Sequence, residues 1–242
     1  MEAIKKILIH VKTGKKYLVK ELGDDYHTQY GVVKAKDFKK ARVESNKNEQ
    51  FLCLEPGFVD LWENLKRGPQ VINQKDIGLI LAKTGVNSRS KAVDAGGGSG
   101  SLCLALANVC KEVTAYEINP ENYDIISRNK QLSGLKNLNI KQANVYEGIE
   151  EKELELITLD LPEPWKMVEQ AEKSLKEGGF LVVYLPNLIQ MKTFIDSCRG
   201  TAIKIIETVE LLERKWKIED KIMRPEFEML GHTGFITFCR RL

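Results

Sequence analysis

The sequence predicts an α/β protein whose larger part is a mostly parallel sheet covered by helices. After Ser88, apolar β-prone runs alternate with helical segments, which is typical of parallel strands joined by crossover helices. A glycine-rich turn, Asp94–Ser101, follows one early run, and Asp160 ends a later one. Ligands of such sheets bind outside the carboxyl ends of the strands, so we expect the turn and Asp160 to share a site.

A smaller domain is expected to come first. Residues 1–57 contain short apolar segments separated by turns, which predicts a small β-rich domain, and residues 58–242 would form the second domain. Glu55–Gly57 separates the two, and the next segment, Phe58–Lys66, has a helical pattern. The predicted strands of the first domain are Ile7–Val11, Lys16–Val19 and Phe51–Leu54.

The second domain is expected to alternate strands and helices. Asn119 can cap a helix that starts at Pro120, and the pair Gly178-Gly179 is expected to close the helix before Phe180. The predicted strands are Ala92–Asp94, Val113–Glu117, Leu138–Gln142, Leu154–Asp160, Phe180–Leu185, Ile203–Leu212 and Gly234–Cys239. The predicted helices are Gly100–Cys110, Pro120–Leu132, Trp165–Leu175 and Asn187–Cys198.

The glycine-rich turn predicts a nucleoside-containing cofactor. Glycines allow positive φ and a close approach of backbone to ligand, and the following helix directs its free N–H groups at the same place. The next strand ends at Glu117, 23 residues after Asp94, where an acidic residue commonly binds ribose hydroxyls. The third glycine comes one residue too early for the dinucleotide fingerprint, and a tight turn with a surface Glu is the alternative.

Asp160 opens a stiff loop. Pro162 and Pro164 fix φ and lack an N–H, so they stop the strand and restrict the segment that follows the carboxylate. An acidic residue can also end a strand without any chemical role. The glycine turn 66 residues upstream favours a site here.

Composition limits the classes of function. With 43% hydrophobic and 29% charged residues among 242, the chain has the composition of a globular protein with a sizeable core. No apolar run approaches the ~20 residues that cross a bilayer, and no signal peptide is recognisable, so we expect a cytoplasmic protein without membrane contact. Five scattered cysteines and three histidines predict buried thiols and no metal site, although Cys198 and Cys239 could pair in a thermophile.

Positive charge gathers at the start of the chain. Residues 1–50 contain 12 Lys or Arg and 7 Asp or Glu, a net +5, whereas the remainder is −2. Such a basic segment is typical of a small domain that contacts RNA. Lysines on an ordinary solvated surface explain the same charge equally well.

Several segments together resemble the TrmI family of tRNA methyltransferases, over about residues 51–240. They are Lys66–Ile72 with Lys75–Ile77, Asp94–Gly100 with Glu117, Leu159–Trp165, Tyr184–Gln190 and Arg224–Phe235. The resemblance implies a Rossmann-like class I methyltransferase with a seven-stranded sheet, and the two final strands without a long helix between them fit this better than a dehydrogenase. It further implies a homotetramer that methylates N1 of adenosine 58, in archaea also 57, in the T-loop of tRNA.

The resemblance also implies a set of site residues. Asp160 and Tyr184 would be catalytic, and S-adenosylmethionine would be the cofactor. Cofactor contacts would come from Gln70, Ile72, Asp94, Gly96, Gly98, Ser99, Gly100, Ser101, Leu102, Glu117, Asn122, Asn144, Val145 and Asp160. Substrate contacts would come from Trp165, Tyr184, Gln190, Arg224 and His232.

The chain departs from the family pattern at two places. Asn144 stands where the family usually has an acidic residue, and its amide can still accept a hydrogen bond from the adenine amino group of the cofactor. The pair Asn73-Gln74 replaces a segment that often holds an aromatic residue and a proline. A base-stacking contribution from that segment is therefore not expected here.

The chemistry of adenine N1 suits a carboxylate at position 160. N1 already has a lone pair, and methylation spreads positive charge over N1 and the amino group, which a neighbouring carboxylate stabilises. Amino-directed methyltransferases typically have a neutral Asn at this place, so Asp160 favours N1. The target base is stacked inside tRNA and must be extruded, and Tyr184, then Trp165, are the aromatic residues expected to line its pocket.

Three alternatives stay open. The chain could be another class I methyltransferase acting on protein or a small molecule, or a non-catalytic RNA-binding subunit of a two-component enzyme. A non-catalytic subunit would be expected to lose the glycine turn, which this chain keeps. A nicotinamide-dependent dehydrogenase fits worst, because the fingerprint spacing is absent.

Overall fold

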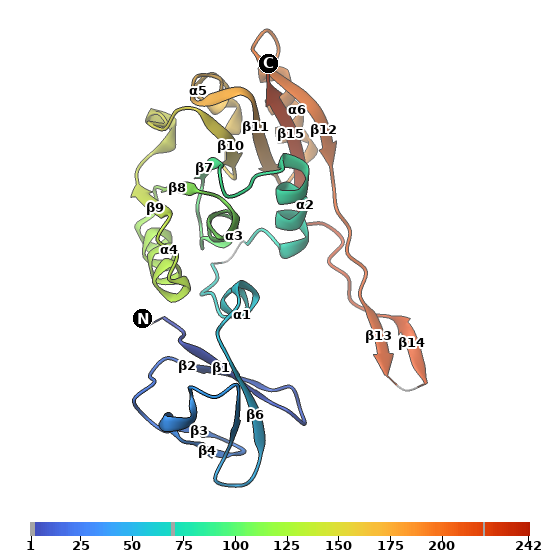
Figure 1. Ribbon diagram of the computed structural model, residues 1–242. Coiled ribbons are helices and arrows are strands. Elements are labelled where there is room, and N and C mark those ends of the chain that lie inside the picture. Colours follow the sequence, from blue (N-terminus) through green and yellow to red (C-terminus); the bar gives the residue numbers. More distant parts are fainter. Residues whose placement is uncertain (1–2, 69–70, 220) are drawn as a thin grey trace. The chain divides into compact units, whose positions relative to one another are not determined.

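The computed structural model describes residues 3–68, 71–219 and 221–242 and separates into two compact units (Figure 1). The first unit holds the chain up to Lys66 together with Arg128–Gly134, and the second holds the remainder. The domain boundary that the sequence predicts, after residue 57, stays a prediction, because compactness alone does not tell which segments fold independently.

The first unit is built around a four-stranded antiparallel sheet in the order β2-β1-β6-β5. Its core contains Leu8, Val33 and Phe51, all fully buried. The sequence missed the shortest strands because three residues carry too little periodic signal. The elements of this unit are β1 (Lys6–His10), β2 (Lys16–Val19), β3 (Tyr26–Thr28), β4 (Gly31–Val33), η1 (Ala35–Asp37), β5 (Arg42–Glu44), β6 (Gln50–Leu54) and α1 (Phe58–Glu63).

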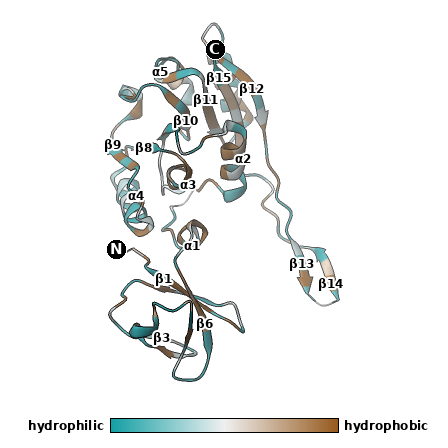
Figure 2. Cartoon of the chain, viewed as in Figure 1, coloured by the Kyte–Doolittle hydropathy of each residue, from teal (hydrophilic) through white to brown (hydrophobic). Residues whose placement is uncertain are grey.

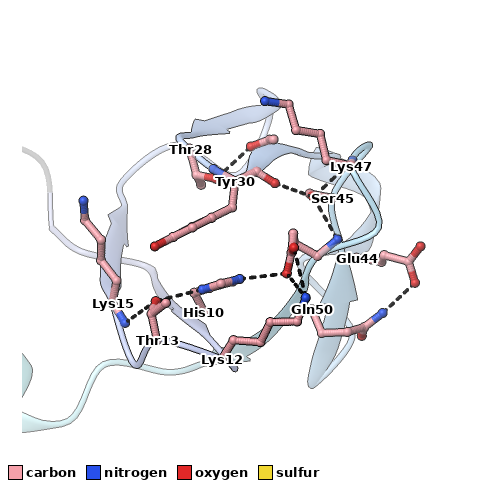
Figure 3. A network of polar contacts seen from close by, with 12 residues as sticks. His10, Lys12, Thr13, Lys15, Thr28, Tyr30, Glu44, Ser45, Lys47 and Gln50 are labelled. Atoms are coloured by element: carbon pink, nitrogen blue, oxygen red, sulfur yellow. Dashed lines mark hydrogen bonds and ion pairs between the residues drawn. The ribbon is translucent and has the colours of Figure 1, made fainter.

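A buried histidine organises one end of this sheet (Figure 3). The His10 ring is stacked 3.7 Å from the Tyr30 ring, and its Nδ1 lies 2.8 Å from the Thr13 hydroxyl. Its Nε2 lies 3.0 Å from a Glu49 carboxylate oxygen, and this contact together with Lys12 lowers the pKa of Glu49. With both ring nitrogens occupied inside the domain, His10 serves the fold of this unit.

The second unit is a seven-stranded mixed sheet in the order β12-β15-β11-β10-β7-β8-β9 (Figure 1). The central strands are buried along most of their length and combine hydrophobic with hydrophilic residues (Figure 2). Its strands are β7 (Lys91–Ala95), β8 (Glu112–Glu117), β9 (Leu138–Gln142), β10 (Leu154–Leu159), β11 (Leu175–Leu185), β12 (Ile203–Val209) and β15 (Phe235–Arg241).

Only β15 runs against its neighbours. It pairs antiparallel with both β11 and β12, whereas β9, β8, β7, β10 and β11 pair parallel in succession. The parallel strands therefore end at one edge of the sheet, where the chain enters β15. The helical elements are α2 (Gln74–Thr84), α3 (Ser101–Val109), α4 (Pro120–Ser133), η2 (Val145–Glu147), η3 (Pro164–Met167), α5 (Val168–Ser174) and α6 (Leu188–Ser197).

Two predicted boundaries are wrong. The segment predicted as one helix, Trp165–Leu175, consists of η3 followed by α5, because Pro164 starts a tight 3₁₀ turn. The pair Gly178-Gly179 does not close a helix; it lies inside β11 at an irregularity of the pairing with β10. Gly178 has a φ of +76°, and a Cβ on Gly179 would lie 2.8 Å from the Leu154 carbonyl oxygen.

The chain between β12 and β15 forms a separate two-stranded antiparallel sheet. Strand β13 (Trp216–Glu219) pairs with β14 (Ile222–Pro225), from Trp216 opposite Pro225 to Glu219 opposite Ile222. The sequence analysis did not predict this hairpin. Among the described residues, no helix is long and apolar enough to cross a membrane.

Candidate active site

A small pocket lies at the carboxyl ends of β7 and β10, next to the start of α3. Asp94 and the glycine turn form one side, Asp160 another, and Ile72 a third. The residues that line it are Ile72, Asp94, Gly96, Gly97, Gly98, Ser99, Ser101, Leu102 and Asp160. All of them except Gly97 are among the cofactor-binding residues that the sequence predicts.

The glycine turn has the shape that the sequence predicts. Gly96, Gly98 and Gly100 all have positive φ, between +54° and +88°. A Cβ on Gly96 would lie 2.1 Å from the Asp160 carbonyl oxygen, and one on Gly100 would lie 2.7 Å from a side-chain carbon of Ile126. Gly100 stands at the N-cap position of α3 and has no side chain there, so the helix start stays open to a ligand.

Glu117 lies beside the turn, at the end of β8. One of its carboxylate oxygens accepts a hydrogen bond from the Gly98 N–H at 2.8 Å, and the other accepts one from the Asn119 N–H at 2.8 Å. The side chain is almost fully buried. These bonds fix the carboxylate next to the pocket, where each oxygen keeps a lone pair for a hydroxyl donor.

Two further carboxylates gather here with raised pKa values. Asp94 is buried and accepts a hydrogen bond from the Thr158 hydroxyl at 2.6 Å; burial raises its pKa to about 7, with Asp160 and Glu117 adding. Asp160 is open to solvent, yet the protein atoms around it remove part of its hydration and raise its pKa to about 6, with Glu117 adding. The pocket is therefore acidic and favours a cationic ligand.

The backbone of Asp160 is fixed to the neighbouring strand. Its N–H donates to the Ala95 carbonyl at 2.9 Å, directly after β10 ends at Leu159. The loop after it is held from two sides: the Gln190 side chain donates to the Pro162 carbonyl at 3.1 Å, and the Glu163 N–H donates to the Tyr146 hydroxyl at 3.1 Å.

Gln190 thus holds the loop in this structure, and its predicted contact with substrate stays a prediction. The sequence analysis missed Tyr146, although it directly follows two residues predicted to bind the cofactor. Its place after β9, at the same sheet edge as Asp160, was the available signal.

Five of the predicted cofactor residues that the structure describes lie outside the lining of the pocket: Gly100 and Glu117, described above, and Asn122, Asn144 and Val145. Asn144 caps η2, accepting a hydrogen bond from the Tyr146 N–H at 3.1 Å, and Val145 is buried behind it. Asn122 is half-buried in the first turn of α4. Gln70 lies outside the described residues. As cofactor ligands, all the residues that the sequence analysis names remain predictions.

Tyr184 is the penultimate residue of β11 and is half-buried. Its hydroxyl donates to a carboxylate oxygen of Asp76 at 3.3 Å, and burial raises its pKa. Its ring packs on Gly234, where a Cβ would lie 2.6 Å from ring atoms. Trp165 is half-buried in η3, in the loop that follows Asp160.

His232 and Arg224 make contacts of a different kind. The His232 nitrogens face a Glu210 carboxylate oxygen at 2.5 Å and the Pro186 carbonyl at 2.8 Å, and these two contacts raise its pKa. His232 therefore ties the ends of β11 and β12 to the segment before β15. Arg224 lies in β14 with its guanidinium 3.8 Å from the Phe227 ring centre, and it is not part of the pocket lining described above.

The described residues contain no group of three or more His, Cys, Asp or Glu side chains arranged to hold a metal ion. All five cysteines are free and buried.

The seven-stranded sheet with one antiparallel strand beside its end, the glycine turn after β7 and the acidic residue ending β8 define this protein as a class I methyltransferase. Residues 51–224 match the family described as tRNA methyltransferase complex GCD14 subunit, and the chain belongs to this family.

Known relatives agree with this assignment. The chain is 33% identical to the tRNA (adenine(57)-N(1)/adenine(58)-N(1))-methyltransferase TrmI of Methanocaldococcus jannaschii, covering 94% of this chain and 92% of the relative. The structure of tRNA (m1A58) methyltransferase TrmI from Aquifex aeolicus matches 100% of this chain and 98% of its own, with a TM-score of 0.76 and 26% identity. A SAM-dependent O-methyltransferase from Thermotoga maritima matches 100% and 94%, with a TM-score of 0.80 and 26% identity.

Proposed function

We propose that this protein is an S-adenosylmethionine-dependent tRNA adenine-N1-methyltransferase that modifies adenosine 58 of the T-loop, and adenosine 57 as well if it acts like its archaeal relative. The observation that carries the proposal is that Asp160 lines the pocket, with its backbone held against the end of β7 and the glycine turn. The relatives named for this activity support the choice of substrate.

The residues present fit S-adenosylmethionine. Gly96 has no side chain, so its backbone can approach both Asp160 and a ligand closely. The carboxylate of the buried Glu117 would accept hydrogen bonds from ribose hydroxyls. Three carboxylates around one pocket suit a ligand that carries a positive sulfonium. When bound, S-adenosylmethionine supplies an electrophilic methyl group.

Asp160 would act on the adenine. As positive charge develops over N1 and the amino group, its carboxylate stabilises that charge and accepts the hydrogen bond of the amino group. The tethers from Gln190 and Tyr146 keep the Asp160 loop in place before substrate arrives, which lowers the entropy cost of reaching the reactive arrangement. Tyr184 and Trp165 would line the base, while His232 would shape the entry by holding Pro186.

The finer elements of the proposal concern tRNA and assembly. Residues 1–50, with their net charge of +5, would contact phosphates of the tRNA in the cytoplasm. The β13–β14 hairpin and the segment after it expose apolar side chains, among them Trp216 at 57%, Ile218 at 69% and Phe227 at 87%. Such a surface supports a homotetramer in which the hairpins meet.

One assay tests the activity. Pure protein is incubated with unmodified tRNA and methyl-labelled S-adenosylmethionine, and the digested RNA is mapped by mass spectrometry. We expect N1-methyladenosine within the T-loop. Label only in N6-methyladenosine would refute the regiochemistry, and transfer to a hydroxyl acceptor instead of tRNA would favour the chemistry named for the Thermotoga maritima relative.

A second measurement tests the assembly. Light scattering on the wild type should give the mass of four chains, and replacing Trp216 and Phe227 with Ser should reduce it. Val59 is an exposed apolar residue of the first unit, and Val59→Ser serves as the control that should keep the wild-type mass. A hairpin variant that keeps the wild-type mass would exclude the hairpin from the interface.

A further inference from the structure

A buried ion pair lies in the first turn of α2. The Lys75 ammonium donates to a carboxylate oxygen of Asp76 at 2.7 Å, with 9% of the Lys75 side chain and none of the Asp76 side chain exposed. The free energy needed to remove two charges from water can exceed the attraction between them. A buried ion pair is therefore poorly explained by its contribution to stability alone. The segment Lys75–Ile77 also stood out in the sequence, and the site described above does not use it.

The pair extends into a network of four side chains from three separate segments. The second carboxylate oxygen of Asp76 accepts the Tyr184 hydroxyl at 3.3 Å, and Lys75 donates to the Thr233 hydroxyl at 2.7 Å. These contacts join α2, the end of β11 and the entry to β15.

The network confines the Tyr184 ring. On one side the ring packs against Gly234, where even a methyl group would collide with it. At its tip the hydroxyl is fixed by Asp76. Leu159 of β10 is paired with Val183 of β11, so Tyr184 lies level with Asp160 at the edge of the sheet.

We infer that Asp76, oriented by Lys75, is a positioning residue that fixes the Tyr184 ring beside Asp160 so that the ring holds the extruded adenine. The inference rests on the proposed function, because it assigns the network to the base-binding side of that site. Tyr184 would touch the base, whereas Asp76 and Lys75 act only through Tyr184.

The first test needs no substrate. Protein labelled with 3-fluorotyrosine is examined by fluorine NMR, and the Tyr184 resonance is identified as the one that Tyr184→Phe removes. In Asp76→Asn, which keeps the shape of the side chain, this resonance should shift and broaden. An unchanged Tyr184 resonance would overturn the inference, whatever the protein methylates.

Glu207→Gln is the matched control. It breaks an exposed pair between the other end of α2 and β12, Lys83 with Glu207 at 2.6 Å, and should leave the Tyr184 resonance unchanged. Thermal unfolding is recorded for every variant. Tyr184→Phe keeps the ion pair between Lys75 and Asp76. It can therefore still be compared with the wild type if Asp76→Asn unfolds more easily.

The second test is a double-mutant cycle on tRNA methylation. Both Asp76→Asn and Tyr184→Phe remove or weaken the hydrogen bond from the Tyr184 hydroxyl to the charged Asp76 carboxylate. We expect each variant to have a kcat about tenfold lower, with the Kd of S-adenosylmethionine unchanged. The double variant should be no slower than the slower single one. Multiplied effects would show that the two residues act independently and would overturn the inference, whereas a wild type inactive on tRNA would refute the proposed function alone.

Discussion

Gly96 and Asp160 meet backbone to backbone: a Cβ on Gly96 would lie 2.1 Å from the carbonyl oxygen of Asp160. The glycine turn after β7 and the Asp160 loop after β10 are thereby held in direct contact. A side chain at position 96 would push apart the two halves of the proposed site.

Gly96→Ala should therefore weaken binding of S-adenosylmethionine and abolish turnover. Its φ of +88° adds strain to the collision for any residue with a Cβ. Calorimetric titration measures the binding. Gly78→Ala is the control, because a Cβ there meets nothing within 4 Å and the residue lies in α2. Normal affinity in Gly96→Ala would show that the two backbones can separate without cost.

Asp160→Asn should lower kcat by about 100-fold or more, because it removes the charge that stabilises the methylated adenine. Binding of S-adenosylmethionine should weaken but stay measurable, because Asp94 and Glu117 still provide negative charge at the pocket. With the Asp160 pKa near 6, the rate of the wild-type protein should fall as the pH drops through about 6, where the carboxylate becomes protonated. Single-turnover rates between pH 5 and 8 test both expectations, and near-normal rates in the variant would refute the assignment of Asp160.

Binding of S-adenosylmethionine should tighten as the pH rises from about 5.5 to 8, because a cation favours the ionised forms of Asp94 and Asp160. S-adenosylhomocysteine is the matched ligand, since it keeps the nucleoside and the amino acid but lacks the sulfonium charge. Its affinity should vary less over the same range. If the affinities of the two ligands changed equally with pH, the charge of the two carboxylates would not contribute to binding of the sulfonium.

Asp94→Asn should stabilise the fold at pH 8 and leave it unchanged near pH 4. The folded-state pKa of about 7 lies above the ordinary 3.8, so between these values the unfolded chain releases a proton that the folded chain keeps. Stability of the wild type therefore falls as pH rises through this window. The gain in the variant should be on the order of 1–3 kcal/mol. Urea unfolding at the two pH values measures it, and a destabilised variant at pH 8 would contradict the expectation.

Much of the second unit could be predicted because its strands are long, apolar and separated by strong turn signals. Strand β9 was placed to the residue, and Asp94 and Asp160 share the pocket as expected. Helix α2 was not predicted, although Ile77 and Ile80 follow a helical period and Gly85 ends it in a left-handed conformation.

The contacts that hold the site together were harder to predict. Asp76 and Tyr184 are 108 residues apart, and no local pattern states that they meet. The hydrogen bond from the Gln190 side chain to the Pro162 carbonyl was not predicted either, because it joins residues 28 apart in the sequence; the predicted substrate contact of Gln190 stays a prediction. The β13–β14 hairpin had a usable signal, since apolar Trp216 and Ile218 alternate with charged Lys217 and Glu219.

Strand β15 begins opposite the end of β12, with Ile236 paired to Val209, so the chain between these strands leaves and re-enters the sheet at the same end. The hairpin within this excursion pairs only with itself among the described strands. Its length and composition can change without moving a strand of the sheet. Substitutions there can therefore accumulate while β7 and β10, which bring Asp94 and Asp160 to the pocket, keep their places.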